Sequence, residues 1–478
     1  MYKWIALLAG FCLMAFELVA ARLLAPTIGS STFIWTNVIG VIMAALAVGY
    51  WLGGKLADKR KRESDIVRLC LITAGIVTLV LLFHGPVIDL ARDISSDARW
   101  QGLIAAILLF APTSVVIGML SPYLAKLAVK TTKETGETVA RLSTFNAIGS
   151  IVGTFLTGFV LFGVIGSRAT LVVVIVGMLI ASWLINPKAR IWHKVAICVA
   201  LMFAVLISMM GSDRSIINID TATSHYRVTK DTVSNHGVTY LSAGPRGIQS
   251  GVLDAGEKTL LFWYTQEIAS VVENYSATKS PEHILILGGG AFTLPEYLGK
   301  KYPDAHVDVV EIDPELEAIS AKHFRFEKPT NVSVFAEDAR SYVNRIKDTT
   351  YDVVILDIFT DADIPWQFIT RQFGEKLASL ISDQGIIIAN TISAETDGCR
   401  AIVDAFTATF AQHHPYVYAK SKTEKPGAMA NREIVFSRTA ANYLDDYNQV
   451  KATNLRTYTD DFAPIEHLQQ SCLNSAKS

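Results

Sequence analysis

The sequence predicts a bundle of membrane-spanning helices, then a small β-strand region, and then a soluble α/β domain. Three observations carry this fold class. Apolar runs of spanning length recur up to residue 211, the composition beyond is that of a globular protein, and predicted strands and helices alternate from residue 281. A chain of 478 residues is also too long for one ordinary domain. We therefore divide it into residues 1–211, 212–280 and 281–478.

Seven apolar runs have about the 20 residues that a helix needs to cross a bilayer. They occupy residues 4–22, 33–54, 66–86, 101–121, 143–165, 169–186 and 194–211. No small-residue cleavage site followed by a soluble chain comes after the first run, so we interpret it as a span and not as a signal peptide. The last run is short enough to be interfacial instead. We expect about seven helices, with the lipid bilayer as a partner.

Two features inside the runs bear on function. Glu17 lies in the first run, where an ionisable group is costly. It is either a functional group or a residue near the interface that pairs with Arg22, and the sequence leaves both interpretations open. Gly149 and Gly153 have the small-xxx-small spacing that lets two helices pack closely.

Basic residues gather in alternate loops between the runs. They are Lys55, Lys59, Arg60, Lys61 and Arg62 after the second run, Lys126, Lys130, Lys133 and Arg141 after the fourth, and Lys188, Arg190 and Lys194 after the sixth. The positive-inside rule places these loops and the amino terminus in the cytoplasm. With seven spans, the soluble part would then lie outside the cell.

The soluble part is organised around residues 283–313. The apolar segment Ile284–Leu287 predicts a buried strand, which three glycines (Gly288, Gly289 and Gly290) turn sharply. Helical spacing follows, and a second strand ends at Glu311. A strand, glycine turn, helix and strand with an acid about 20 residues beyond the glycines is typical of a nucleoside site in which the acid binds the ribose.

Two more acids follow predicted parallel strands. Asp338 comes just after strand 332–336, and Asp357 directly follows strand 351–356. Ligands of open α/β sheets bind outside the carboxyl ends of the strands, so these acids and Glu311 are expected around one crevice. Alternatively, each acid caps the helix that follows its strand.

The glycine turn limits the choice of nucleoside. Its sequence lacks the lysine of a triphosphate-binding loop and differs from the GxGxxG pattern of nicotinamide and flavin sites. A crevice lined by acids would repel phosphate and attract a sulfonium. The residues therefore favour S-adenosylmethionine or its decarboxylated form.

The rest of the composition excludes other classes. The 43 basic and 44 acidic residues nearly balance, so no nucleic-acid partner is indicated. The five cysteines are scattered without a CxxC or His/Cys cluster, so we expect neither a metal site nor a disulfide framework. Before the α/β domain, strands are predicted in residues 226–231, 238–243, 247–254 and 259–267, and the tail from residue 442 is predicted to be irregular.

At these residues the chain resembles the spermidine synthase (polyamine aminopropyltransferase) family, in the bacterial form that follows a multi-span membrane region. The segments ILGGGAFTLPEYL, VVEIDPELEAISAKHF, AEDARSYV, YDVVILDIFTDADIP and TDDFAPIE follow the family's order and spacing, over roughly residues 217–468. Methyltransferases share the fold and the first half of this pattern. The resemblance implies a Rossmann-like, methyltransferase-like domain that transfers an aminopropyl group from decarboxylated S-adenosylmethionine to putrescine, giving spermidine and methylthioadenosine.

The resemblance also assigns roles to residues. Asp357 would accept the proton of the attacking amine. The co-substrate would be held by Gly288, Gly289, Gly290, Glu311, Asp338, Ala339 and Pro365, and the amine by Asp361, Gln249, Tyr264 and Gln266. The chain departs from the family at Ala291, which replaces an aspartate of the glycine turn, and at Arg227, which replaces a glutamine.

Two other functions remain open from the sequence. One is an S-adenosylmethionine-dependent methyltransferase on the same fold. The other is a membrane transporter or sensor whose soluble domain binds a polyamine or nucleoside without turnover. Decarboxylated S-adenosylmethionine is a co-substrate and not a tightly bound cofactor, and a homodimer is a possible assembly. Because this co-substrate is made in the cytoplasm, we expect a cytoplasmic soluble domain on the bacterial inner membrane, against the charge count.

Overall fold

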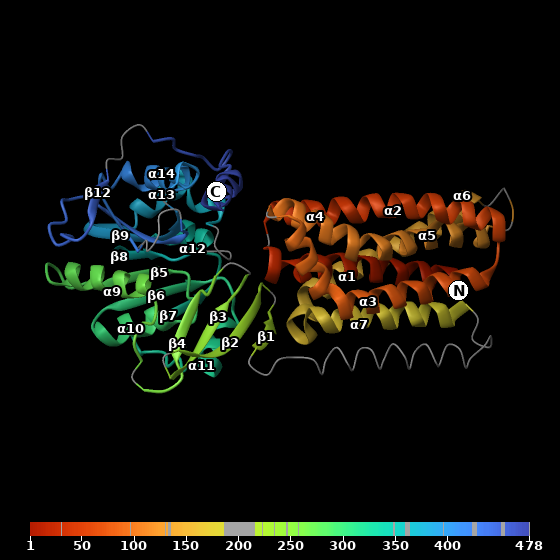
Figure 1. The fold of residues 1–478 in the computed structure, drawn as a ribbon, viewed down its shortest axis with the longest axis horizontal. Helices are drawn as coiled ribbons and strands as arrows, with labels where there is room; N and C mark the ends of the chain where they lie inside the picture. The colour runs from red at the N-terminus through yellow and green to blue at the C-terminus, as the bar shows by residue number, and fades with distance from the viewer. Residues whose placement is uncertain are drawn as a thin grey trace. The chain divides into compact units, whose positions relative to one another are not determined.

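The computed structural model describes most of the chain. The described residues are 1–29, 31–95, 97–129, 131, 135–185, 216–221, 223–233, 235–244, 247–256, 258–347, 349–358, 364–394, 396–422, 428–450 and 455–477. The chain divides into two compact units, Met1–His225 and Tyr226–Ser478. Each unit has its own hydrophobic core. Figure 1 shows the helices and strands of both units.

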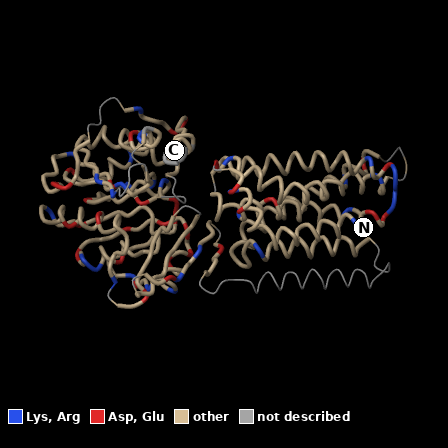
Figure 2. The backbone as a smooth tube through the Cα atoms, in the orientation of Figure 1, with Lys and Arg blue, Asp and Glu red and all other residues tan. Residues whose placement is uncertain are grey.

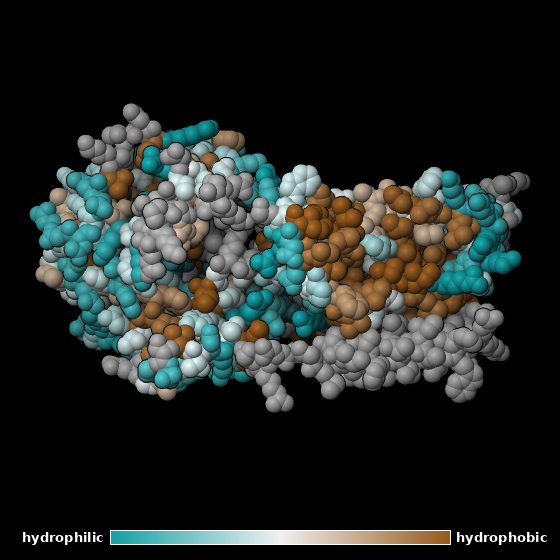
Figure 3. Space-filling view, viewed as in Figure 1, coloured by the Kyte–Doolittle hydropathy of each residue, from teal (hydrophilic) through white to brown (hydrophobic). Residues whose placement is uncertain are grey.

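The first unit is a bundle of long apolar helices. Its elements are α1 (Tyr2–Ile28), α2 (Thr32–Arg60), α3 (Glu63–Ile94), α4 (Ala98–Leu109), α5 (Ala111–Ala128), α6 (Thr135–Leu156), the π-helical turn η2 (Thr157–Leu161), α7 (Phe162–Ile185) and strand β1 (Ile216–Asp220). Brown, apolar side chains cover much of the face that Figure 3 shows over these helices. Four helices in the described ranges are long and apolar enough to cross a membrane, and a fifth crossing is added if α4 and α5, bent by 50°, are one span. The expectation of about seven spans stays a prediction, since the run 194–211 lies outside the described residues.

The fourth of these long segments, Thr135–Ile185, reverses direction inside its 51 residues. Gly149 and Gly153 of α6 pack on the backbone of Leu7 and Phe11, where an added Cβ would lie 1.9 and 2.5 Å from their carbonyl oxygens. The α6 helix therefore runs parallel to α1. Helix α7 runs antiparallel to α1. Its start lies near the end of α1, where Phe162 stacks with Arg22, and the carbonyl of Val174 further along accepts from the thiol of Cys12. The helical path breaks at Gly166, whose φ of 75° is left-handed.

The two ends of this bundle are defined by polar contacts. At one end the Tyr2 hydroxyl donates to Glu63 at the start of α3, beside the basic loop after α2 (Figure 2). At the other end the carboxylate of Asp220 accepts from the backbone N–H of Ser167 at 2.6 Å, and Arg22 donates to the carbonyl of Thr221 at 2.6 Å. The chain therefore leaves this unit through β1 at the end opposite the amino terminus.

The second unit begins with a small antiparallel sheet and continues as a Rossmann-like domain. The small sheet contains β2 (His225–Val233), β3 (His236–Ser242) and β4 (Ser250–Leu253), and helix α9 (Trp263–Ser276) follows. The large sheet has the strand order β12-β10-β11-β9-β8-β5-β6-β7. Its strands are β5 (His283–Leu287), β6 (His306–Glu311), β7 (Val332–Ala336), β8 (Tyr351–Leu356), β9 (Ile381–Ser393), β10 (Tyr416–Ser421), β11 (Ala430–Ser437) and β12 (Asn448–Val450).

Helices alternate with these strands as the sequence predicts. They are α10 (Thr293–Lys301), α11 (Leu316–His323), α12 (Ala339–Arg345), the 3₁₀ turn η3 (Trp366–Phe368), α13 (Arg371–Ala378), α14 (Asp397–Ala411) and α15 (Ile465–Lys477). Strands β7, β6, β5, β8 and β9 are parallel, whereas β11 and β10 are antiparallel to their neighbours. The reversal of strand order between β5 and β8 puts the carboxyl ends of β5, β6 and β8 at one edge, where ligands of such sheets bind.

Three predictions of local structure are wrong. Residues 263–267 begin helix α9 and do not form a strand. The buried residues between Tyr264 and Tyr275 recur with the period of a helix, so one face of α9 packs on the domain. The tail contains helix α15, which packs on α14. Cys399 and Cys472, which are 73 residues apart in sequence, form a disulfide between these two helices.

Candidate active site

The glycine turn after β5 is pressed against the end of β8. Gly288 has a φ of 101° and donates its N–H to the carbonyl of Val310 at 2.9 Å. A Cβ at this position would lie 2.1 Å from the carbonyl oxygen of Asp357, so a residue without a side chain is required there. The turn thereby fixes the backbone of Asp357 beside the ligand-binding edge.

Glu311, at the end of β6, holds the turn from the other side. Its Oε2 accepts from the N–H of Gly289 at 2.8 Å and its Oε1 from the N–H of Asp313 at 3.0 Å. Burial raises the pKa of the carboxyl, and the two backbone donors offset part of that rise. A carboxylate has about four acceptor sites, so the free lone pairs of Glu311 can still bind ribose hydroxyls.

Asp338 has the capping role that the sequence left open. Its Oδ1 accepts from the N–H of Ser341 at 2.8 Å, so it is the N-cap of α12, and the next residue, Ala339, is buried in the first turn of that helix. A cap and a ligand contact are compatible, because the second carboxylate oxygen is not needed for the cap. The role of both residues beside an adenine remains a prediction.

Asp357 immediately follows β8, and its carboxyl group is desolvated at this edge. Its Oδ1 accepts from the side-chain amide of Asn390 at 2.9 Å. Desolvation raises the pKa of Asp357 to about 6, and the nearby Glu311 adds to that rise while Asn390 opposes it. A carboxylate with this pKa is largely charged near neutral pH yet binds a proton far better than an exposed aspartate, which suits a general base.

The end of the small sheet and the start of α9 lie close to this edge. The Ser250 hydroxyl accepts from the N–H of Ala291 in the glycine turn at 3.0 Å. Tyr264, 7 % exposed, donates to the carbonyl of Gln249 at 2.7 Å. Burial, with the charges of Asp357 and then Glu433, raises the pKa of this phenol. The structure thus brings Tyr264 close to Asp357, and Gln249 close to Tyr264.

The roles of the other three predicted residues stay predictions. Gln266 is exposed on α9, and its amide donates to the carbonyl of Leu260 at 2.7 Å. Pro365 precedes η3 and has intermediate burial. Asp361 lies outside the described residues.

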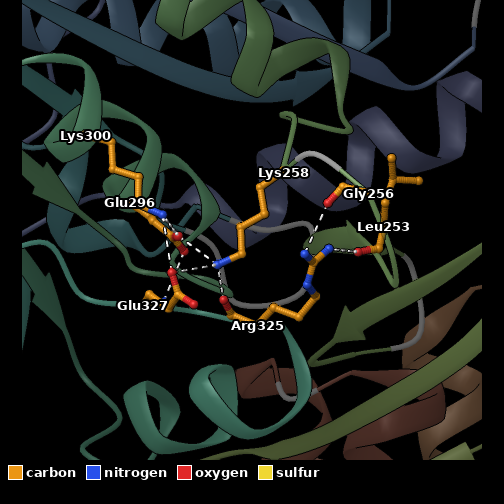
Figure 4. A network of polar contacts seen from close by, with 7 residues as sticks. All are labelled: Leu253, Gly256, Lys258, Glu296, Lys300, Arg325 and Glu327. Atoms are coloured by element: carbon orange, nitrogen blue, oxygen red, sulfur yellow. Dashed lines mark hydrogen bonds and ion pairs between the residues drawn. The ribbon is translucent and has the colours of Figure 1, made fainter.

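A network of charges holds the loop after β4 onto α10 and the 325–327 segment (Figure 4). The buried carboxylate of Glu296 accepts from Lys258 at 2.8 Å and from Lys300 at 2.6 Å. Arg325 donates to the carbonyls of Leu253 and Gly256 at 3.0 and 3.1 Å. These contacts join the end of β4 and the loop after it to α10 and Arg325, so they hold the small sheet against the Rossmann-like domain.

Two site residues were missed by the sequence analysis. Asn390 lies on β9 and orients Asp357, and Glu433 lies on β11 with 0 % exposure. The sequence analysis looked for acids that follow parallel strands, whereas Glu433 lies within a strand that is antiparallel to β9. The available signal was a charged residue directly before the apolar run Ile434–Phe436 of a buried strand.

Part of the second unit matches a known domain family. Residues 261–420 match the spermine/spermidine synthase domain. The resemblance of the sequence to that family is thereby confirmed for this segment. The match covers the glycine turn, all three strand-end acids and α9, but ends before Glu433.

Several curated relatives are polyamine aminopropyltransferases. The enzyme of Vibrio vulnificus is 36 % identical over 143 residues, which are 29 % of this chain and 46 % of that protein. A probable polyamine aminopropyl transferase of Bifidobacterium longum is 26 % identical over 222 residues, 38 % of this chain and 48 % of the relative. Polyamine aminopropyltransferase 2 of Ralstonia nicotianae is 23 % identical over 408 residues, 80 % of this chain and 76 % of that protein. The chain spans about half the length of the first two relatives.

Solved structures include similar chains. A probable spermidine synthase from Corynebacterium glutamicum matches 50 % of this chain and 95 % of its own, with 19 % identity and a TM-score of 0.43.

Proposed function

We propose that this chain, which carries a spermine/spermidine synthase domain in residues 261–420, is a membrane-anchored aminopropyltransferase. It would move the aminopropyl group of decarboxylated S-adenosylmethionine to putrescine or a related amine. The observation that carries the proposal is the desolvated carboxylate of Asp357 beside the glycine turn and Glu311. A sulfonium and an ammonium are both cations, and an edge with this much negative charge attracts both.

The chemistry needs one proton acceptor and a fixed approach. The amine binds as an ammonium, and its proton passes to Asp357, which frees the nitrogen lone pair. The nitrogen attacks the carbon next to sulfur, the C–N bond forms, and the electron pair of the breaking C–S bond stays on sulfur. Neutral methylthioadenosine leaves, and the proton on Asp357 returns to solvent. Glu311 and the glycine turn would hold the nucleoside in line.

Product analysis with the detergent-purified full chain tests this function. We expect incubation with decarboxylated S-adenosylmethionine and putrescine to release methylthioadenosine and a lengthened amine. S-adenosylhomocysteine from S-adenosylmethionine, without methylthioadenosine, would identify a methyltransferase instead. Binding of nucleoside or amine without either product would favour the non-catalytic alternative.

We further propose that the helical unit spans the membrane and that the second unit lies on the outer side. Three observations support this placement. The basic loops predict a cytoplasmic amino terminus, β1 leaves the bundle at the end opposite Tyr2, and Cys399 and Cys472 form a disulfide in the second unit. Disulfides persist in oxidising compartments and are rare in the cytosol. The disulfide thus argues against our expectation of a cytoplasmic domain, and an outer site would require the co-substrate to be supplied on that side.

Reporter fusions after Ser478 of the full chain test the side directly. We expect alkaline phosphatase, which needs an oxidising compartment, to be active, and green fluorescent protein to stay dark. In the same cells, thiol labelling after denaturation without reductant should miss Cys399 and Cys472 but label Cys12 and Cys70, which are free cysteines among the described residues. A fluorescent fusion together with labelling of Cys399 and Cys472 would place the domain in the cytoplasm.

A further inference from the structure

One buried carboxylate near Asp357 has no role in the mechanism above. Glu433 of β11 has 0 % exposure, and within the described part of the chain neither of its carboxylate oxygens has a hydrogen-bond partner. It also has no ion pair among the described residues. Buried polar groups are almost always paired, and an unpaired buried carboxylate is costly. Packing of the domain therefore does not explain this carboxylate, but binding of a ligand would.

The sheet register puts Glu433 beside the base. Glu433 is the cross-strand partner of Asn390, and Asn390 donates to Asp357 at 2.9 Å. Asp357 in turn follows Leu356, the partner of Ala389. Because cross-strand partners point to the same face, Glu433 and Asn390 share a face with the base. Adjacent strands lie about 4.8 Å apart, so the backbones of Asp357 and Glu433 are about 10 Å apart.

The charges around Glu433 are of its own sign. Burial, the charge of Asp357 and the charge of Glu267 all raise the pKa of Glu433. Its other cross-strand partner is Lys420, but the Lys420 ammonium donates to Glu267 at 2.8 Å. The cation that could have neutralised Glu433 is therefore committed to the neighbouring acid.

A primary ammonium fits these surroundings. It brings one positive charge and three N–H donors, which two unpartnered carboxylate oxygens can accept. We propose that Glu433 binds the second, non-reacting ammonium of the acceptor, so that the site selects a short diamine over a monoamine. The inference rests on the proposed function, in which Asp357 serves the reacting nitrogen. Glu433 is thus a binding residue for the substrate and not a second base.

The test compares Glu433→Gln with the wild-type chain on two acceptors. Gln keeps the shape and removes the charge. We expect the KM for 1,4-diaminobutane to rise about 10- to 100-fold, the loss of one charge-assisted hydrogen bond, and the KM for butylamine to change less than about twofold. Glu273→Gln is the matched control, since Glu273 is a partly exposed glutamate of α9 that pairs with Lys301. Equal effects on both amines, or none, would overturn the inference.

Binding measurements keep the inference testable if the chain proves to have another activity. Calorimetry of the full chain with 1,4-diaminobutane requires no turnover. Weaker binding by Glu433→Gln but not by Glu273→Gln would support the inference even if no methylthioadenosine forms. Equal binding by the wild type and Glu433→Gln, or no binding by the wild type, would refute it. A thermal melting curve verifies that each variant is folded, and removal of a buried charge should not lower the melting temperature.

Discussion

Asp357→Asn is expected to lower kcat by about 10²- to 10⁴-fold while making the soluble domain more stable. The loss follows from the chemistry, since an amide cannot take the proton that the attacking amine must lose. The contact with Asn390 need not be lost, because the carbonyl oxygen of an asparagine can accept the same hydrogen bond. An inactive variant with normal structure separates the loss of a base from the loss of the fold.

The gain in stability follows from the sign of the pKa shift. The folded domain raises the pKa of Asp357 from 3.8 to about 6, so it binds the proton more tightly than the unfolded chain does. Stability from this group is fully present below about pH 4, declines as the pH rises towards 6, and is lost above that value. The cost at pH 7 is on the order of 2–3 kcal/mol, since one pKa unit corresponds to about 1.4 kcal/mol. The neutral side chain of the Asn variant avoids this cost.

Two measurements check the prediction. Thermal melting at pH 7 and at pH 4 should show a higher melting temperature for the variant at pH 7 and little difference at pH 4. The kcat/KM of the wild type should fall as the pH drops through about 6, because the base is then protonated. Asp338→Asn is the control. It also neutralises an acid at a strand end and keeps the N-cap of α12, but it removes no proton acceptor. Full turnover by Asp357→Asn would remove Asp357 from the mechanism.

The sequence was informative where one local pattern determines the structure. The period of the apolar residues, the glycine turn and the acids at the ends of β6 and β8 predict the α/β domain and its ligand-binding edge. Glu311 and Asp357 lie at that edge as predicted, where Glu311 accepts from Gly289 and the carbonyl of Asp357 lies against Gly288. These features depend on residues close in sequence or on strand ends that any parallel sheet brings together.

What could not be predicted depends on contacts between distant segments. The disulfide joins helices whose cysteines are 73 residues apart, and spacing alone does not define such a pair. Glu433 reaches the site only because β11 pairs with β9, and no motif marks that pairing. The start of α9 looked like a strand because aromatic and β-branched residues favour strands, but packing of the buried face from Tyr264 to Tyr275 outweighs that preference.

The second large effect is expected for Gly288→Ala, which should lower affinity for the nucleoside by at least about 100-fold and destabilise the domain by roughly 2–4 kcal/mol. Its Cβ would lie 2.1 Å from the carbonyl oxygen of Asp357, closer than two such atoms can approach, and its φ of 101° is strained for any residue with a side chain. Relief requires the turn to move away from β8, which displaces both the base and the N–H of Gly289 that Glu311 binds.

Gly256→Ala controls for the strain alone, because Gly256 has a φ of 84° but no atom within 4 Å of an added Cβ. Calorimetry with methylthioadenosine and thermal melting should show a modest destabilisation of about 1 kcal/mol and unchanged affinity for this control. If both variants behave alike, the close approach of the turn to Asp357 does not shape the site, and the nucleoside must bind elsewhere than at the carboxyl ends of β5 and β8.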